Sequence, residues 1–479
     1  MMLLVYNTLS RSKEEFRPLE GKKVCMFVCG QTVYDDAHLG HAKNYINFDV
    51  VARWLRRSGY DVKYIQNITD IDDKIIKRAQ EEGTDPIELA RRFETRFMED
   101  MEAIGVRKGV DQYPRSHDYI SEMVFQIQLL LDKGYAYVID DDVYYDVSKF
   151  QDYTKLSGMH LDELEKHRIE PREGKRNSYD FSLWKAAKES EPSWRIELTV
   201  DGKARSLNGR PGWHIEDTAI THAIFGKQYD LHGGAIELIF PHHTNEIAQA
   251  EAAFGVKPFV KYWMHSGIML IKGEKMSKSL KNFIRIRELL KRYDAEALRL
   301  LVISTHYRKD FGYTEEFIKK AAARMNYLYA SFSIFYNMNE TSDEAVPEEI
   351  GKMATDLDSG FAQAMDDDFN TPLALIRLSA AIDFLRTYAQ ANREIGKAAK
   401  DLAVESVINN AQVLGILGKD SYKHKLAPEA ANLIRDRERL RKEGKFNEAD
   451  AIREKLRLEH SISLEDSEYG TIWYSTLQS

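Results

Sequence analysis

The chain has 479 residues, enough for about three domains of roughly 150 residues each. Its 43% hydrophobic and 30% charged residues exclude a disordered or collagen-like chain, and two cysteines, Cys25 and Cys29, are too few for a disulfide-stapled scaffold. The formal net charge of −8 excludes a basic coat over the whole surface, although a local basic face is still allowed. The low cysteine count favours a reducing compartment.

The first residues show no pattern of a targeting segment. The apolar stretch 1–5 is soon followed by Arg11, Lys13 and Glu14, so the hydrophobic region of a secretory signal is missing. No run of about 18 apolar residues occurs anywhere in the chain. We therefore expect no membrane span and a cytoplasmic protein.

Up to about residue 303, short apolar runs alternate with amphipathic helical stretches. The expected strands are 24–29 and 62–69, and the expected helices that follow them are 45–57 and 72–82. That alternation predicts a parallel α/β sheet. Residues 135–147 alternate around Asp140-Asp141-Asp142, a pattern typical of a hairpin, and this hairpin would lie in an insertion at about 105–200.

From about residue 300 to 418 the pattern turns helical, with apolar residues three and four apart. The expected helices are 315–338, 351–365, 371–389 and 403–415. The run from Asp366 to Pro372 should separate two of them, because it offers an N-cap residue and a proline at a helix start. The remaining residues predict a charged helical pair, 428–443 and 447–458, and an extended tail that ends at Trp473.

The first chemical motif, His38-Leu39-Gly40-His41, begins ten residues after Val28, where a loop should enter a helix. Free N–H groups and the helix dipole attract anions there, and histidines three residues apart share one helix face. Gly40 would let a nucleotide lie against the backbone. The motif therefore suits ATP phosphates, although by itself it fits equally well a pair of surface histidines at a helix cap.

The second motif is a loop with two lysines, Lys275-Met276-Ser277-Lys278-Ser279. Such a loop suits mobile phosphate clamping, but alone it is more often a solvated basic loop. The two motifs together, roughly 240 residues apart, resemble the class I aminoacyl-tRNA synthetases. The resemblance implies amino-acid activation, in which a carboxylate attacks the α-phosphorus of ATP and pyrophosphate leaves.

This resemblance also implies roles for the motif residues. Lys278 would act on the pyrophosphate side with support from Lys275, and His38 and His41 would contact the transition-state oxygens. The ATP-binding residues would be His38, Gly40, His41 and Lys278. ATP would enter as a substrate together with Mg²⁺.

A third constellation bears on the amino acid. Cys29 ends the first strand, while His242 and Glu246 lie four residues apart on one face of an expected helix. Thiolate, imidazole and carboxylate are all zinc ligands. A zinc ion with one open position would capture a substrate thiol as the thiolate, because the cation lowers the thiol pKa. Each residue also has an ordinary explanation, namely a buried strand cysteine and a helix side-chain pair.

At this point the whole chain resembles the cysteinyl-tRNA synthetases. The matching segments are 28–35, 67–74, 209–216, 232–234, 241–246, 263–265, 365–371 and 470–473. The family would hold one zinc ion with Cys29, His242, Glu246 and a cysteine 25 positions before that histidine. Here this position is Asp217, the largest departure from the family. Asp217 can still ligate the metal through oxygen, which makes the donor set harder than one with cysteine at this position. Alternatively, Asp217 does not ligate and the affinity for metal falls.

The resemblance also implies a substrate pocket formed by Cys29, Thr69, Trp213 and His232. Trp213 would supply an apolar wall, Thr69 a hydroxyl for the α-amino group, and His232 a polar partner near the carboxylate. Trp213 as plain core and Thr69 as a strand-end cap are the alternatives. Smaller departures from the family pattern gather near this pocket: Gln31, Ala235, Glu237, Thr244 and Lys281.

The fold implied is α/β: a Rossmann-like parallel sheet in a catalytic domain, 1–303, split by the insertion. An all-α stem and anticodon-binding bundle, 304–418, and a tRNA-binding extension, 419–479, would follow. Over 432–457 nine Lys and Arg stand against six Asp and Glu. Arg435, Arg439 and Lys442 share a helical face that would contact tRNA(Cys), although such a run is usually a solvated helix.

Three functions stay open at this level. The first is zinc-dependent charging of tRNA(Cys) with cysteine, and the second is a cysteine-activating ligase that joins cysteine to a small-molecule amine. The roughly 170 residues after Ile303 argue for tRNA. The third is a non-catalytic RNA-binding paralogue, against which the intact histidines and lysines of the two motifs argue. We expect a monomer.

Overall fold

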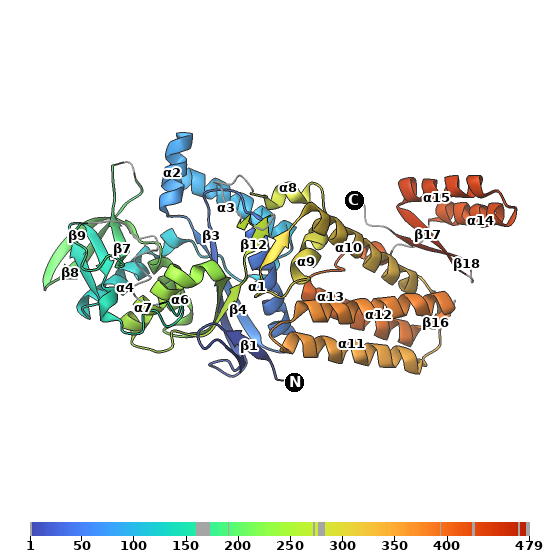
Figure 1. The fold of residues 1–479 in the computed structure, drawn as a ribbon, viewed down its shortest axis with the longest axis horizontal. Coiled ribbons are helices and arrows are strands. Elements are labelled where there is room, and N and C mark those ends of the chain that lie inside the picture. The colour runs from blue at the N-terminus through green and yellow to red at the C-terminus, as the bar shows by residue number, and fades with distance from the viewer. Residues whose placement is uncertain are drawn as a thin grey trace. The chain divides into compact units, whose positions relative to one another are not determined.

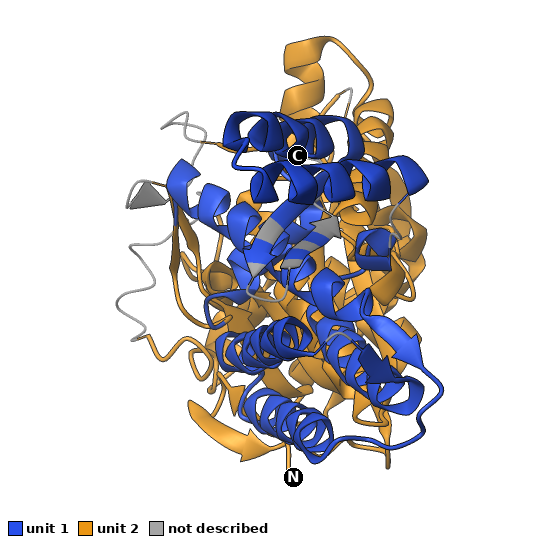
Figure 2. Ribbon diagram, turned by 90° about the vertical axis from the view of Figure 1, so that its right-hand side faces the viewer, with its two compact units in different colours: residues 1, 288–306, 313–479 blue, residues 2–287, 307–312 orange. Residues whose placement is uncertain are grey.

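A computed structural model describes residues 2–159, 173–189, 191–271, 274–275, 283–392, 394–423, 427–467 and 470–475. The chain separates into two compact units, each described here by itself (Figure 2). The first unit comprises residues 2–287 and 307–312, and the second comprises 288–306 and 313–479. Within the described ranges, no helix combines the length and the apolar character needed to cross a membrane.

The first unit is built on a four-stranded parallel sheet in the order β11-β10-β3-β4. Its strands are β3 (Lys23–Thr32), β4 (Asp61–Thr69), β10 (Tyr229–Ala235) and β11 (Val260–Ser266). The centre of β3 is almost entirely buried, as expected for a parallel strand covered on both faces. The predicted parallel α/β sheet is confirmed (Figure 1).

Helices follow the first two strands of this sheet, as the alternation predicts. They are α1 (Leu39–Arg57) after β3, and α2 (Asp73–Glu82) and α3 (Pro86–Ala103) after β4. The helix predicted to start at residue 45 begins earlier, at Leu39, because His38 caps it. Small strands complete the unit: β1 (Leu4–Asn7), β2 (Ser12–Glu15), β12 (Met269–Ile271) and β13 (Glu274–Lys275), with α8 (Ile286–Leu290) beginning at its end.

A five-stranded antiparallel sheet lies between β4 and β10 in the sequence. Its strand order is β5 (Ala136–Ile139), β6 (Asp142–Tyr145), β7 (Phe181–Ala186), β9 (Lys203–Pro211) and β8 (Trp194–Val200). The predicted hairpin is β5–β6, with Asp140 at a φ of 52° in its turn. α4 (Ile120–Asp132), α6 (Ile215–Phe225) and α7 (Thr244–Phe254) pack together beside this sheet. Phe27 and Trp184 belong to one continuous core, so the inserted sheet is packed onto the parallel one.

The second unit is mainly helical, as the apolar spacing predicts. Its long helices are α9 (Ala295–Ile303), α10 (Glu315–Tyr336), α11 (Glu348–Asp366), α12 (Thr371–Ala391) and α13 (Lys397–Leu414). α11 and α12 are separated at Asp367–Asn370, and the Asn370 side chain accepts a hydrogen bond from the backbone N–H of Leu373. Short strands β15 (Asn339–Thr341) and β16 (Glu394–Gly396) pair with each other in its connections. β14 (Phe311–Tyr313), most of which belongs to the first unit, joins the small sheet of β12 and β13.

The last residues form a small module with its own core of Ala430, Ile434, Leu456, Ile462 and Leu464. It contains α14 (Pro428–Lys442), α15 (Phe446–His460), β17 (Ile462–Ser467) and β18 (Gly470–Ser475). The predicted helical pair is confirmed. The extended tail is also present, and β17 and β18 pair with each other as an antiparallel hairpin.

Candidate active site

A cavity of about 320 Å³ opens where the carboxyl ends of β3 and β4 meet the start of α1. Cys29 and Thr69 line it from the strand ends, His38 and His41 from the helix start, and Trp213 from the segment before α6. This is the edge at which parallel α/β sheets bind ligands. We call this cavity the cleft.

The end of β3 approaches β4 so closely that only glycine fits. A Cβ on Gly30 would lie 1.5 Å from the backbone oxygen of Asn67. The Gly30 N–H donates a 2.6 Å hydrogen bond to the Asn67 side chain, and the register between the strands shifts between Val28 and Gln31. This irregularity lets Cys29 and its neighbours leave the regular sheet and border the cleft.

The histidine motif caps α1 as expected. Nδ1 of His38 accepts hydrogen bonds from the N–H groups of Gly40 and His41, and Nδ1 of His41 accepts one from the His38 N–H. The two rings stack with centroids 3.7 Å apart. Burial, with smaller effects of His38 and Lys74, holds the pKa of His41 well below its usual value. Because Nδ1 of each ring accepts, the neutral rings carry the proton on Nε2, the atom that would donate to a phosphate oxygen.

The lysine loop is described only in part. Lys275 lies in β13, paired with Leu270 of β12, and Lys278 lies outside the described residues. Just after the loop, the Leu39 N–H donates to the Ile284 oxygen and the Ile286 N–H donates to the Ala37 oxygen, both at 3.0 Å. The segment that follows the loop is therefore hydrogen-bonded to the residues immediately before and after His38.

The four predicted metal ligands come together from four elements. Cys29 comes from β3, Asp217 from the first turn of α6, His242 from the turn before α7, and Glu246 from the first turn of α7. One ligand atom from each lies within 4.8 Å of all the others. Nε2 of His242 is 3.2 Å from Oδ2 of Asp217 and 3.1 Å from Oε1 of Glu246.

The chemistry of this cluster fits a bound cation. Both carboxylate oxygens of Glu246 are fully buried and have no hydrogen-bond partner, although imidazole nitrogens lie close to them. Burial, followed by the charges of Asp217 and Glu246, raises the pKa of the Cys29 thiol well above its usual value. Without a cation, ionisation of the buried Cys29, Asp217 and Glu246 is unfavourable, because their negative charges repel one another. A divalent ion such as zinc would offset that repulsion and favour the ionised side chains.

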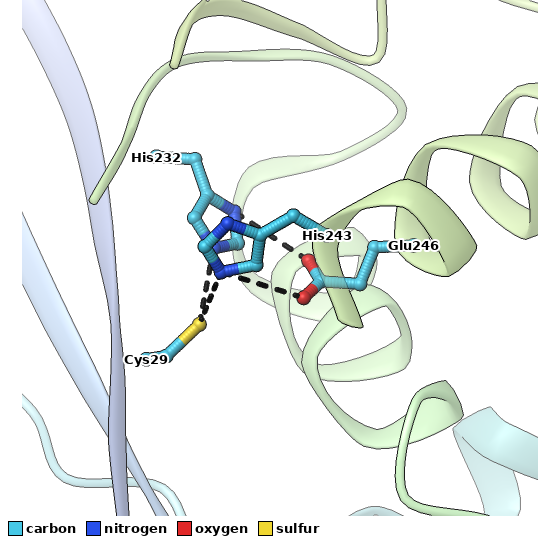
Figure 3. Close-up of side chains that lie close together, drawn as sticks. All are labelled: Cys29, His232, His243 and Glu246. Carbon is cyan, nitrogen blue, oxygen red and sulfur yellow. Dashed lines mark hydrogen bonds and ion pairs between the residues drawn. The ribbon is translucent and has the colours of Figure 1, made fainter. Parts of the chain in front are cut away.

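A second donor set shares Cys29 and Glu246 with the first. Nε2 of His232 and Nε2 of His243 lie 3.2 and 3.0 Å from the Cys29 sulfur, and the four side chains converge as Figure 3 shows. Nδ1 of His232 hydrogen-bonds the Tyr229 hydroxyl at 2.6 Å, which fixes the ring orientation. His232 is fully buried and does not line the cleft, so it lies behind Cys29.

The other predicted substrate residues do line the cleft. Thr69 is buried and its hydroxyl donates a 2.9 Å hydrogen bond to Glu216, so its oxygen can still accept one from an ammonium group. The half-buried Trp213 ring stacks on His242 with centroids 4.4 Å apart. The indole therefore forms a wall beside the metal-binding cluster.

Several residues of the site were not among the sequence-based candidates. Asn67 donates to Asp217 at 2.6 Å, His243 points at Cys29, and the buried Glu216 accepts from Thr69. Asn67 and Glu216 lie within segments that carry the family resemblance, and His243 directly follows a predicted ligand. Their positions were visible in the sequence, but their contacts depend on the packing of distant segments.

Comparisons with known proteins agree with this geometry. Residues 15–323 match the family model of the tRNA synthetases class I (C) catalytic domain, and residues 360–418 match the DALR domain. The cysteine–tRNA ligase of Thermococcus gammatolerans is 45% identical over 99% of both chains, and that of Geobacter sulfurreducens is 42% identical over 99% of both chains. The chain belongs to the cysteine–tRNA ligase family. The predicted family, the cysteinyl-tRNA synthetases, is thereby confirmed.

Solved structures of other synthetases share the fold of this cysteine–tRNA ligase family member. The methionyl-tRNA synthetase of Mycobacterium tuberculosis in complex with methionyl-adenylate has a TM-score of 0.57 at 16% identity, covering 82% of this chain and 90% of that one. The LeuRS of Agrobacterium radiobacter in a ternary complex also gives 0.57, at 11% identity and 83% and 84% coverage. The predicted class I fold with a helical C-terminal part is confirmed.

Proposed function

We propose that this chain activates L-cysteine with ATP to form cysteinyl-adenylate and transfers the cysteinyl group to tRNA(Cys). The observation that carries the proposal is the placement of two sets of residues at one cleft. The capping histidines His38 and His41 line the same cavity as three of the four clustered metal donors. A phosphate-binding helix start thus lies beside a cluster suited to a thiol-binding ion.

In this proposal Cys29, Asp217, His242 and Glu246 hold one zinc ion, which when bound supplies an open position for the substrate thiolate. A serine hydroxyl binds such an ion much more weakly, so cysteine is selected without an editing domain. The apolar face of Trp213 covers the substrate side chain, and the Thr69 oxygen accepts a hydrogen bond from the α-ammonium group. His232 orients the pocket from behind Cys29.

The phosphate end of the cleft completes the reaction. His38 and His41 donate from Nε2 to oxygens of the ATP phosphates, and the backbone at Gly40 allows the nucleotide to lie close. Lys278, supported by Lys275, would bind the departing pyrophosphate together with its Mg²⁺ ion. The chain's contribution is orientation of the carboxylate and the α-phosphorus, together with stabilisation of the charge that develops.

The partner in the second step is a tRNA, recognised partly by the charged face of α14. The small-molecule ligase and the non-catalytic paralogue are not retained, because the match to curated tRNA ligases extends over 99% of the chain and of the relative. Monomeric state, cytoplasmic location and the identity of the metal stay predictions.

Exchange of labelled pyrophosphate into ATP tests the activation step, using metal-analysed protein and a panel of cysteine, serine, alanine and methionine. Cysteine-dependent exchange with little response to serine is expected. Absence of exchange with every amino acid in zinc-replete protein would contradict the proposal. Charging of tRNA(Cys) transcript then tests the transfer step, and exchange without charging would point to a different acceptor.

A further inference from the structure

One cation in the cleft, at the end of the matching segment 67–74, has been given no role so far. Lys74 is the only lysine or arginine among the described residues that line the cleft. It stands in the first turn of α2, where the Asp72 side chain accepts a 2.7 Å hydrogen bond from its backbone N–H and so fixes the start of the helix. Within the described part of the chain its ammonium forms no ion pair.

The exposed Lys74 side chain brings its ammonium close to two aromatic rings. Nζ lies 5.6 Å from the Tyr34 ring centroid and 5.8 Å from that of Trp213. Cation–π contact favours a charged lysine at such a position without neutralising it. Trp213 in turn stacks on His242. The charge of Lys74 also acts on His41 and helps to lower the pKa of that histidine. The ammonium therefore lies between the metal-binding end and the histidine end of the cleft.

The activation step brings two anions together, and a cation beside them would stabilise their approach. When the cysteine carboxylate attacks the α-phosphorus of ATP, two anionic groups approach each other. A carboxylate C–O–P bond forms, the bond from phosphorus to the bridging oxygen breaks, and pyrophosphate leaves with that electron pair. His41 is held neutral by burial, so it donates a hydrogen bond but brings no full charge.

We propose that Lys74 is a catalytic residue whose ammonium contacts both the amino-acid carboxylate and an α-phosphate oxygen as they join. The ammonium acts through its charge alone: it lowers the repulsion between the two anions and stabilises the charge that develops in the transition state. This inference rests on the proposed function, because it takes cysteine and ATP as the substrates. It adds to the proposed active site a cation that does not come from the lysine loop.

The test compares Lys74→Met and Lys74→Arg with the wild type in cysteine-dependent pyrophosphate exchange. Lys77→Met is the matched control, because Lys77 lies on the same helix, is exposed and does not line the cleft. We expect Lys74→Met to lower kcat by about 10²–10³-fold, with a smaller change in the KM for cysteine and in the KM for ATP. Lys74→Arg should recover part of the rate, and Lys77→Met should match the wild type.

Two results would overturn the inference. The first is exchange by Lys74→Met at the wild-type kcat. The second is a rise in the KM for cysteine or ATP alone, which would indicate uniform binding and no transition-state role. Calorimetric binding of a sulfamoyl analogue of cysteinyl-adenylate gives a readout without turnover, and Lys74→Met should weaken it. Equal thermal stability and zinc content in the variants exclude a folding defect. Absence of cysteine-dependent pyrophosphate exchange in the wild type would instead contradict the proposed function itself.

Discussion

The side-chain amide of Asn67 donates a 2.6 Å hydrogen bond to Oδ1 of Asp217, and Oδ2 of the same carboxylate faces His242. Both residues are buried. Asp217 stands where the family resemblance implies a cysteine, and a thiolate accepts hydrogen bonds only weakly. Asn67 therefore orients a carboxylate, leaving one oxygen directed at the cluster, as partners of metal ligands commonly do.

Replacing Asp217 should weaken zinc binding. Asp217→Ala removes one metal donor together with the hydrogen bond from Asn67 that orients it. We therefore expect zinc affinity to fall at least as much as on loss of an orienting partner, about 10–100-fold. Titration with a chelator, followed by metal analysis, measures this. Asp217→Cys is the matched control and should tighten zinc binding, because a thiolate is the softer ligand. Unchanged affinity in Asp217→Ala would show that Asp217 is not a ligand.

Asp36 should couple the lysine loop to the histidine motif. Arg96 binds its two oxygens at 2.5 and 2.7 Å, and Arg285 and Arg287, just after the loop, approach it to 3.3 and 3.5 Å. We expect Asp36→Ala to slow pyrophosphate exchange about tenfold, since the loop end loses its anchor beside His38. Its free energy of unfolding should fall by about 1–2 kcal/mol.

The Asp36 prediction has a control in the same unit. Glu82 also binds two arginines, Arg78 and Arg92, but on the surface. Surface pairs contribute about 0–1 kcal/mol, so Glu82→Gln should change neither exchange nor the urea midpoint appreciably. If the two variants behaved alike, the proposed anchoring by Asp36 would be wrong.

The C-terminal module should loosen at acid pH through Asp466. The fully buried Arg437 donates to both its oxygens at 2.7 Å, and this hydrogen-bonded pair lowers the pKa of Asp466 to about 2 from an ordinary value of 3.8. Because the folded pKa is the lower one, the pair stabilises the module above about pH 4 and the effect is lost as pH falls toward 2.

Hydrogen exchange of residues 428–467 in the full chain measures this effect. Asp466→Asn should increase exchange at pH 5, since it leaves Arg437 buried without its ion pair, at a cost of about 2 kcal/mol. The difference from the wild type should shrink toward pH 2.5. A difference of the same size at both pH values would contradict the assigned pKa.

The charged face of α14 should act only in the tRNA step. Lys442 is exposed, and Arg439 is exposed with partners on its own helix, Asp436 and Glu443. The triple variant Arg435→Ala, Arg439→Ala, Lys442→Ala should raise the KM for tRNA in charging and flatten its dependence on salt. Cysteine-dependent exchange should stay at the wild-type rate. Unchanged charging at both low and high salt would mean that this face is merely solvated.

Much of the site was predictable because its residues belong to local patterns. His38 caps the helix that its motif implies, since a side chain two or three residues from free N–H groups needs no distant partner. Cys29, His242 and Glu246 were identified by resemblance, and the cluster brings them together with Asp217. The contacts of Asn67 and His243 were not predictable, because they join segments about 150 and 214 residues apart.

The amino-acid sequence by itself determined the alternation of strands and helices, the helical second half and the two nucleotide motifs, because periodicity and capping act over a few residues. Only the tertiary structure decided which side chains face one another across the cleft. It placed Lys74 between Tyr34 and Trp213, and His232 behind Cys29. Burial and charge at those positions follow from the packing of separate elements, which no local pattern encodes.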